Sequence, residues 1–135
     1  MGSQTVTVWL LDSNAVMGYL NQDSAPGFIG HFEQALLEGA AVSVITTIEV
    51  LGWRGHDANS RASAEKLLGC LDEIPLATSV VRQTISLRSS YQIKLPDAVI
   101  AATAMTHNLK LMTRNRADFE RVAGLSIVNP FIVTG

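Results

Sequence analysis

The sequence predicts an α/β fold, a three-layer α/β/α sandwich around a central parallel sheet of four or five strands. Two observations support this prediction. Short apolar runs typical of buried strands alternate along the chain with stretches of helical length. No internal repeat or linker-like segment divides the sequence, so residues 1–135 are expected to form a single domain. Strands that alternate with helices in this way are joined by right-handed crossovers, which makes the sheet parallel.

The first strand is predicted at residues 6–11, where an almost continuous apolar run ends at Asp12, as expected for a strand covered on both faces. Further strands are predicted at residues 41–44, 73–77, 109–113 and 125–128. Helices are predicted at residues 13–20, 25–38, 60–71, 78–92 and 117–123, with Gly39 as the C-cap of the second. Two more are predicted, one that starts at residue 46 and one that starts at Pro96 and ends at His107 and Asn108.

Composition narrows the possible functions. The chain is 47% hydrophobic, enough for a proper core, and its formal net charge is −2. A protein that holds nucleic acid by bulk electrostatics usually carries a basic face, so any contact with nucleic acid must be local. An acidic cluster bridged by a metal allows such a contact, because a bound cation reverses the local sign of the field.

The chain carries one cysteine, Cys70, which cannot form an internal disulfide and is expected to be a buried structural thiol within an apolar repeat. No window has the roughly 20 continuous apolar residues that a membrane span needs. Residues 1–4 lack the basic start of a signal peptide. These features predict a cytoplasmic protein without a membrane segment.

Four acidic residues follow predicted strands or begin predicted helices: Asp12, Glu49, Asp97 and Asp118. Ligands of parallel α/β sheets sit beyond the carboxyl ends of the strands, and the topology brings these distant residues to that edge. Several carboxylates in one cleft need a counter-cation. Oxygen ligands suit Mg²⁺ or Mn²⁺ rather than zinc, so the four acids are predicted to form a metal site that is also the catalytic site.

Each acid also has an ordinary structural interpretation. Asp12 suits a helix N-cap, and Asp97 suits the first turn of a helix, where a carboxylate complements the helix dipole. Glu49 is equally well explained as a solvated helix residue, and Asp118 as an exposed helix start with a local ion pair. It is their joint occurrence at strand ends that favours a functional site.

The segments around these acids resemble the four acidic motifs of the PIN-domain nucleases, in the family's order and over nearly the whole chain. The resemblance is closest to the VapC group of toxins. It rests on Leu-Leu-Asp-Ser-Asn at 10–14, Ile-Thr-Thr-Ile-Glu at 45–49, Leu-Pro-Asp-Ala-Val-Ile-Ala-Ala-Thr-Ala at 95–104 and Thr-Arg-Asn-Arg-Ala-Asp-Phe at 113–119.

The resemblance implies a PIN-like fold and a Mg²⁺- or Mn²⁺-dependent endoribonuclease, usually paired with a small antitoxin and usually a homodimer. It assigns metal binding to the same four acids. Asn14 and Asn115 would be supporting residues, together with Thr113. Many relatives have Asp where this chain has Asn115, a departure that bears on whether two metals bind without RNA.

Three cations flank the predicted cluster and are candidates for contacts with RNA phosphates, namely Lys94, Arg114 and Arg116. Solvation at the surface explains them nearly as well. The three histidines show no mutual spacing that suggests a zinc site or a pair of general bases: His31, His56 and His107.

Three other functions remain as alternatives. A phosphoryl-receiving regulatory α/β domain would need an acid after the third strand, where residues 75–78 contain none. A phosphatase with an Asp-x-Asp motif would need a second acid where Asn14 stands. A PIN fold that binds RNA or a partner without cleaving is the third, and the intact acids argue against it.

Overall fold

The structure, a computed structural model, describes residues 6–130. Within that range five strands and seven helices alternate in the predicted manner. The strands are β1 (Trp9–Leu11), β2 (Ala40–Ser43), β3 (Asp72–Ile74), β4 (Lys110–Met112) and β5 (Ile127–Val128). The helices are α1 (Ser13–Leu20), α2 (Phe28–Glu38), α3 (Val44–Leu51), α4 (Ala58–Gly69), α5 (Thr78–Ser90), α6 (Leu95–Thr106) and α7 (Arg116–Phe119).

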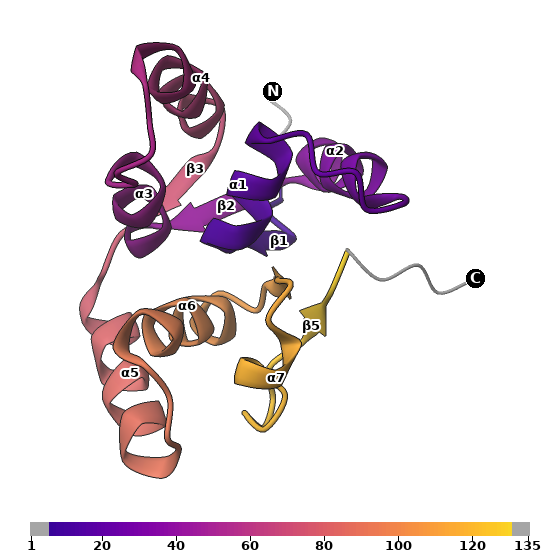
Figure 1. Cartoon of the computed structure of the whole chain (residues 1–135). Coiled ribbons are helices and arrows are strands. Elements are labelled where there is room, and N and C mark those ends of the chain that lie inside the picture. The colour runs from indigo at the N-terminus through magenta and orange to yellow at the C-terminus, as the bar shows by residue number, and fades with distance from the viewer. Residues whose placement is uncertain (1–5, 131–135) are drawn as a thin grey trace, which may run out of the picture.

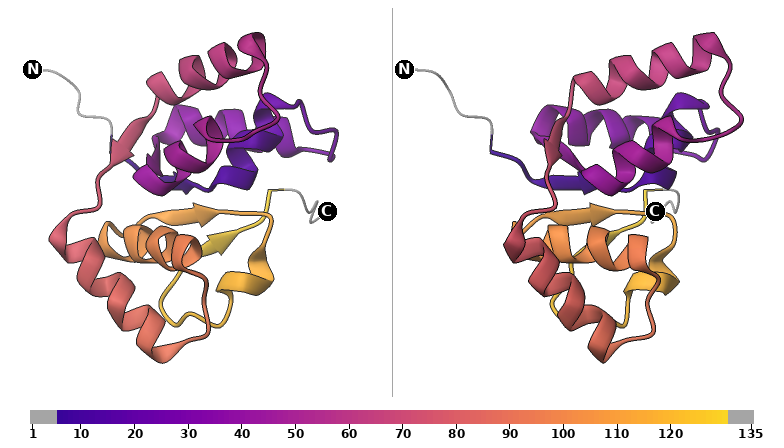
Figure 2. Two further views of the ribbon diagram at one scale, coloured as in Figure 1. Left: turned by 60° about the vertical axis from the view of Figure 1, so that its left-hand side comes forward. Right: turned by 90° about the vertical axis from the view of Figure 1, so that its left-hand side faces the viewer.

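The five strands form one sheet in the order β3-β2-β1-β4-β5, and every neighbouring pair is parallel. β1 is therefore central, with β2 on one side and β4 on the other. Figures 1 and 2 show this sheet between the helices of the N-terminal half and those of the C-terminal half. The predicted three-layer sandwich with a parallel sheet of four or five strands is confirmed.

Successive strand residues point to opposite faces of the sheet and build two hydrophobic cores. Leu10 and Leu111 pack with apolar residues of α5, α6 and α7. Their neighbours Leu11 and Met112 pack with apolar residues of α1 to α4. Because the strands are covered on both faces, their sequences are apolar runs rather than alternating patterns.

Two glycines fix where α2 lies. Gly27 precedes the helix at φ 79°, so the helix begins at Phe28 rather than at the predicted residue 25. Gly39 follows it at φ 114°, and a Cβ atom at this position would lie 2.4 Å from the carbonyl oxygen of Val6. The chain can therefore turn from α2 into β2 close beside the segment that leads into β1.

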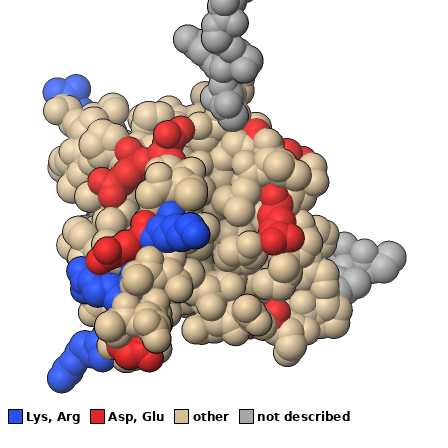
Figure 3. Space-filling view, turned by 90° about the horizontal axis from the view of Figure 1, so that it is seen from above, with Lys and Arg blue, Asp and Glu red and all other residues tan. Residues whose placement is uncertain are grey.

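The surface carries mixed charge. On the face that Figure 3 shows, the basic side chains lie beside acidic ones along one side, and no continuous basic surface covers that face. This agrees with the formal net charge of −2. In the described part of the chain, no helix is both long enough and apolar enough to cross a membrane.

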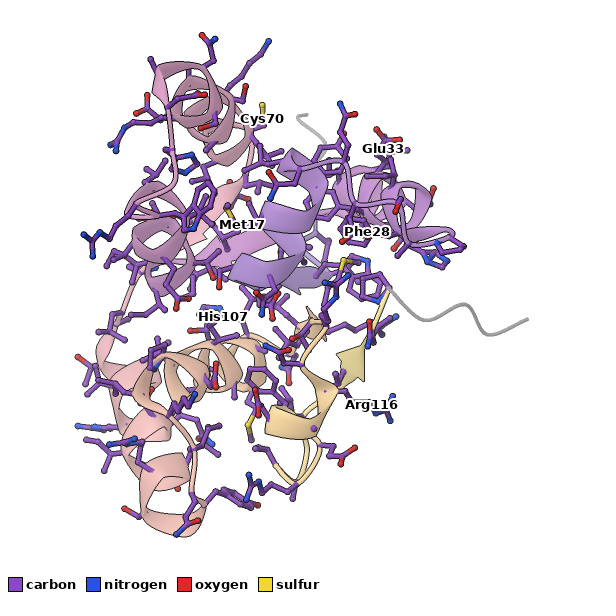
Figure 4. The ribbon with its side chains drawn as sticks, viewed as in Figure 1. Met17, Phe28, Glu33, Cys70, His107 and Arg116 are labelled. Atoms are coloured by element: carbon purple, nitrogen blue, oxygen red, sulfur yellow. The ribbon has the colours of Figure 1, made fainter. Side chains whose placement is uncertain are left out.

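The prediction that Cys70 is a buried structural thiol is wrong, because the side chain is exposed. The helix α4 ends at Gly69, and among its own residues only Ala64 is buried. Cys70 therefore follows a helix that is mostly exposed, and Figure 4 shows it at the end of α4. The apolar neighbours Leu67 and Leu68 are only partly buried against the core.

Candidate active site

Asp12 lies directly after β1 at the carboxyl edge of the sheet. Its side chain accepts a hydrogen bond from the backbone N–H of Ala15 at 2.8 Å and so caps α1. The residue is only 3% exposed. Burial, together with the nearby charges of Asp97 and Glu49, raises the pKa of Asp12 to about 6, although its hydrogen bonds act in the opposite direction. Asp12 is thus an N-cap and also a desolvated acid facing other acids.

Thr113 connects the ends of β1 and β4. It follows β4, is fully buried, and its hydroxyl is hydrogen-bonded to the carboxylate of Asp12. The same hydroxyl accepts a hydrogen bond from the backbone N–H of Asn115 at 3.0 Å. Thr113 therefore fixes the orientation of Asp12 and the start of the segment that leads to α7.

Glu49 reaches the site from α3, which begins directly after β2. Ser43 caps that helix by accepting a hydrogen bond from the backbone N–H of Ile45 at 3.2 Å, so the helix starts two residues before the predicted position 46. Glu49 is exposed, and its Oε1 accepts a hydrogen bond from Ser13 Oγ at 2.9 Å. The hydroxyl of Ser13 thus orients the carboxylate of Glu49, a role that the sequence did not predict for Ser13.

The other two acids come from the C-terminal half. Asp97 is the third residue of α6 and is partly buried. Desolvation raises its pKa, the charges of Asp118 and Glu49 raise it further, and the charge of Lys94 lowers it. Asp118 lies on α7 and is exposed. The electrostatic coupling connects Asp97 both to Asp118 and to the two acids of the N-terminal half.

The fold therefore brings the four predicted acids to one edge of the sheet, two from each half of the chain. They do not form a closed metal cage, because among residues 6–130 no three acidic, histidine or cysteine side chains lie close enough to hold an ion. The arrangement nevertheless fits Mg²⁺ or Mn²⁺. Mg²⁺ commonly uses one or two carboxylates and keeps several waters, and the burial of Asp12 and the mutual repulsion of the acids favour a cation.

The two asparagines have different surroundings. Asn14 is exposed in the first turn of α1, two residues after Asp12. Asn115 is the N-cap of α7, but its side chain makes no capping hydrogen bond. The side-chain oxygen and nitrogen of Asn115 therefore do not cap α7. Both side chains remain candidates for polar contacts at the site.

Two of the three predicted RNA-binding cations contact acids of the protein itself. Arg114 is paired with Asp23 at 2.9 Å, and Arg116 lies 3.9 Å from Glu120. Arg116 projects outward from α7 in Figure 4. Lys94, the N-cap residue of α6, lies instead close enough to Asp97 to lower its pKa.

The histidines lie outside the acidic cluster. His56 Nε2 lies 2.7 Å from the carbonyl oxygen of Val50, and His56 Nδ1 lies 2.9 Å from Ser60 Oγ. These hydrogen bonds stabilise the loop between α3 and α4. His31 is exposed on α2, and His107 is the exposed C-cap of α6.

Sequence reasoning missed one basic residue of this region. Arg121, two residues after α7, lines a small pocket together with Lys94, Asp97 and Asp118. No local motif contains it, and its nearness to Lys94 depends on the packing of α6 against α7. In the sequence, only the position of Arg121 three residues after Asp118 weakly indicates that it lies near the site.

Comparison with known proteins agrees with the geometry. The sequence matches the PIN domain family over residues 9–125. No match is found among curated protein sequences. A chain of the toxin-antitoxin complex from Klebsiella pneumoniae is 30% identical, with a TM-score of 0.73, and the alignment covers 92% of this chain and 98% of that one.

Two further solved structures share the fold at lower identity. FitAcB from Neisseria gonorrhoeae has a TM-score of 0.79 at 24% identity, covering 93% of this chain and 100% of that chain. VapBC2 from Rickettsia felis, bound to a DNA fragment from its promoter, has a TM-score of 0.79 at 20% identity, covering 90% and 98%. With its fold, its four acidic segments and the family match in agreement, the chain belongs to the PIN-domain family.

Proposed function

We propose that the protein is a Mg²⁺- or Mn²⁺-dependent endoribonuclease that hydrolyses RNA phosphodiester bonds in the cytoplasm as the toxin of a toxin–antitoxin pair. One observation is central to this proposal. Four carboxylates that are far apart in sequence meet at one sheet edge, where burial and, to a lesser extent, their mutual charges raise the pKa values of Asp12 and Asp97. The match to the PIN domain family, whose members are generally nucleases, supports it.

In this proposal Asp12, Glu49, Asp97 and Asp118 hold the cation. When bound, a divalent ion of this kind supplies a water of lowered pKa and positive charge against a phosphate. The chain's own residues orient the acids: Thr113 holds the carboxylate of Asp12, and Ser13 holds that of Glu49. Asn14 and Asn115 add neutral polar groups that can contact a phosphate without repelling it.

The proposed partners are an antitoxin and a second copy of the chain. The antitoxin is supported by the toxin-antitoxin complex that is 30% identical over most of this chain. A homodimer is supported by large exposed apolar side chains on three neighbouring helices, α3, α5 and α6: Ile48 at 60%, Ile85 at 60% and Leu95 at 56% exposure.

Cleavage of RNA is expected to require the metal. With total RNA as substrate, the purified protein should produce defined fragments in Mg²⁺ or Mn²⁺ and none in excess EDTA, because the four carboxylates alone repel a phosphodiester. The fragment ends, mapped by sequencing, report the cleavage sites. Undiminished cleavage in excess chelator would exclude the metal mechanism, and no cleavage with either ion would favour a PIN fold that only binds.

Expression of the chain alone is expected to arrest bacterial growth, and co-expression of its antitoxin, a small protein, should restore it. Growth curves after induction measure this, and an Asp97→Asn variant is the matched control because it removes one proposed metal ligand. Normal growth with abundant folded protein would indicate a PIN nuclease that is not a toxin. Equal arrest by the Asp97→Asn variant would show that toxicity does not depend on cleavage.

A further inference from the structure

A small pocket beside the acidic residues combines both signs of charge. It has a volume of 140 Å³ and is lined by Asp97 and Asp118 together with Lys94 and Arg121. Pockets that take a whole drug-sized ligand measure about 300–1,000 Å³, so this one fits a single small group. Its two acids belong to the proposed metal site, and its two cations line the same space, Lys94 from the start of α6 and Arg121 from the segment after α7.

The two cations are not engaged elsewhere. Among the described residues, the side chain of Arg121 makes no hydrogen bond or ion pair, and the side chain of Lys94 has only its electrostatic interaction with Asp97. This distinguishes them from Arg114 and Arg116, which lie against Asp23 and Glu120. They are therefore available for an anion without the loss of an existing pair.

The surrounding structure fixes the two backbone segments that carry the cations. Arg88 on α5 donates a hydrogen bond to the carbonyl oxygen of Ile93 at 2.7 Å, which fixes the loop just before Lys94. The backbone N–H of Ala123 donates to the hydroxyl of Tyr91 at 3.3 Å. That bond connects the loop before α6 to the segment after α7 that carries Arg121. The pocket is thus a pre-organised part of the fold.

The start of α6 adds to the positive field. Lys94 is its N-cap residue, and no side chain caps the helix by a hydrogen bond. The N-terminus of a 12-residue helix carries a partial positive charge from its free N–H groups, which attracts anions. With a formal net charge of −2, the chain needs a local feature of this kind to hold an anionic strand.

We propose that Lys94 and Arg121 form a phosphate subsite that binds the backbone of the RNA strand beside the bond to be cleaved. The inference rests on the proposed function, because the adjoining carboxylates are taken as the cleavage site. The subsite contacts phosphate and no base, so it sets the path and register of the strand rather than its sequence. Lys94 and Arg121 are positioning residues for the substrate.

Binding of a short fluorescent single-stranded RNA, measured by anisotropy over a NaCl series in the Asp97→Asn background, tests the subsite. Lys94→Ala and Arg121→Ala should each weaken binding roughly tenfold, the loss expected for a charge-assisted hydrogen bond. Each should also lower the slope of log affinity against log salt by about 0.7. Lys66→Ala, which removes an exposed cation from α4, is the matched control and should change neither.

Two further arms make the interpretation specific. Arg121→Lys keeps the charge and should retain the salt slope, which separates a phosphate contact from a folding defect. The Ala substitutions should weaken the binding of a DNA strand of the same sequence by the same factor, because the subsite does not contact the 2′-hydroxyl. In the cleaving protein Arg121→Ala should raise KM while kcat stays close to its original value.

The possible failures are distinguishable. If the parent protein cleaves RNA and both Ala variants keep their affinity, salt slope and KM, the subsite is wrong and the nuclease proposal stands. If the parent protein never cleaves but both variants lose binding and salt slope, the subsite stands and the nuclease proposal is wrong. A loss seen with RNA but not with DNA would also overturn a subsite that reads phosphate alone.

Discussion

Replacing Asp97 with asparagine is expected to abolish RNA cleavage and leave the metal-free protein no less stable than before. Burial raises the pKa of Asp97, and the charges of two other acids, Asp118 and Glu49, raise it further. The substitution removes one repelling charge from this group and one proposed ligand from the cation. Cleavage should fall by about two orders of magnitude or more, since the charge stabilisation of a metal at the phosphate contributes several kcal/mol.

Thermal melts with and without Mg²⁺, beside a cleavage assay on the same proteins, measure both effects. In the parent protein Mg²⁺ should raise the melting temperature with concentration, because a ligand bound only by the folded state stabilises it by mass action. Asp97→Asn should lose most of that rise. Asp72→Asn, which changes an exposed acid at the start of β3, should retain it.

The opposite pattern would show that Asp97 is only a partner of the helix dipole. In that case the substitution should lower the free energy of unfolding by about 0.3–1 kcal/mol and leave cleavage intact. A destabilised but fully active variant would therefore contradict the site assignment.

Stability of the metal-free protein is expected to fall as the pH rises from about 4 to above 6, through the titration of Asp12. In the folded state burial raises the pKa of Asp12 from 3.8 to about 6. The folded state thus binds the proton more tightly than the unfolded chain does. The stabilisation from the protonated carboxyl is complete below the unfolded pKa and is lost as the pH passes the folded value.

The size of this effect follows from the shift. A difference of about two pKa units corresponds to about 3 kcal/mol of unfolding free energy at 1.36 kcal/mol per unit. Urea denaturation in EDTA at a series of pH values measures it. Asp12→Asn is the informative comparison, since asparagine can also cap α1 but does not titrate.

The difference in stability between Asp12→Asn and the parent protein should grow in favour of the variant as the pH rises to neutrality. Comparison of the two proteins cancels the contribution of the exposed acids, among them Asp57, whose pKa is lowered by its hydrogen bonds to Ser60. Saturating Mg²⁺ should reduce the difference near pH 7. A pH-independent difference would mean that Asp12 does not titrate in this range.

The sequence predicted the architecture because strands covered on both faces differ clearly from amphipathic helices. It predicted which acids meet because the carboxyl ends of parallel strands share one edge. Exact boundaries were missed where a single backbone conformation decides them. α2 begins after Gly27 in a left-handed conformation, and α3 begins two residues early because Ser43 supplies the cap.

Other features depend on contacts that no local pattern encodes. Cys70 was predicted to be buried because Leu67, Leu68 and Leu71 surround it, but the helix before it buries little and the side chain faces out. The hydrogen bond from Ser13 to Glu49 joins residues 36 positions apart. Arg121 comes close to Lys94 only because α6 and α7 pack on the same face of the sheet.

The placement of β1 at the centre of the sheet has a consequence for biosynthesis. Trp9 pairs with Lys110 across the β1–β4 interface, about a hundred residues further along the chain. Asp12 and Glu49 are made early, and Asp97 and Asp118 come from the last third of the chain. Pairings over such long separations form late, because the chain must first close a large loop. A ribosome-bound chain that has emerged only as far as β3 therefore holds half of the acids, and the site is complete only when β4 joins the sheet.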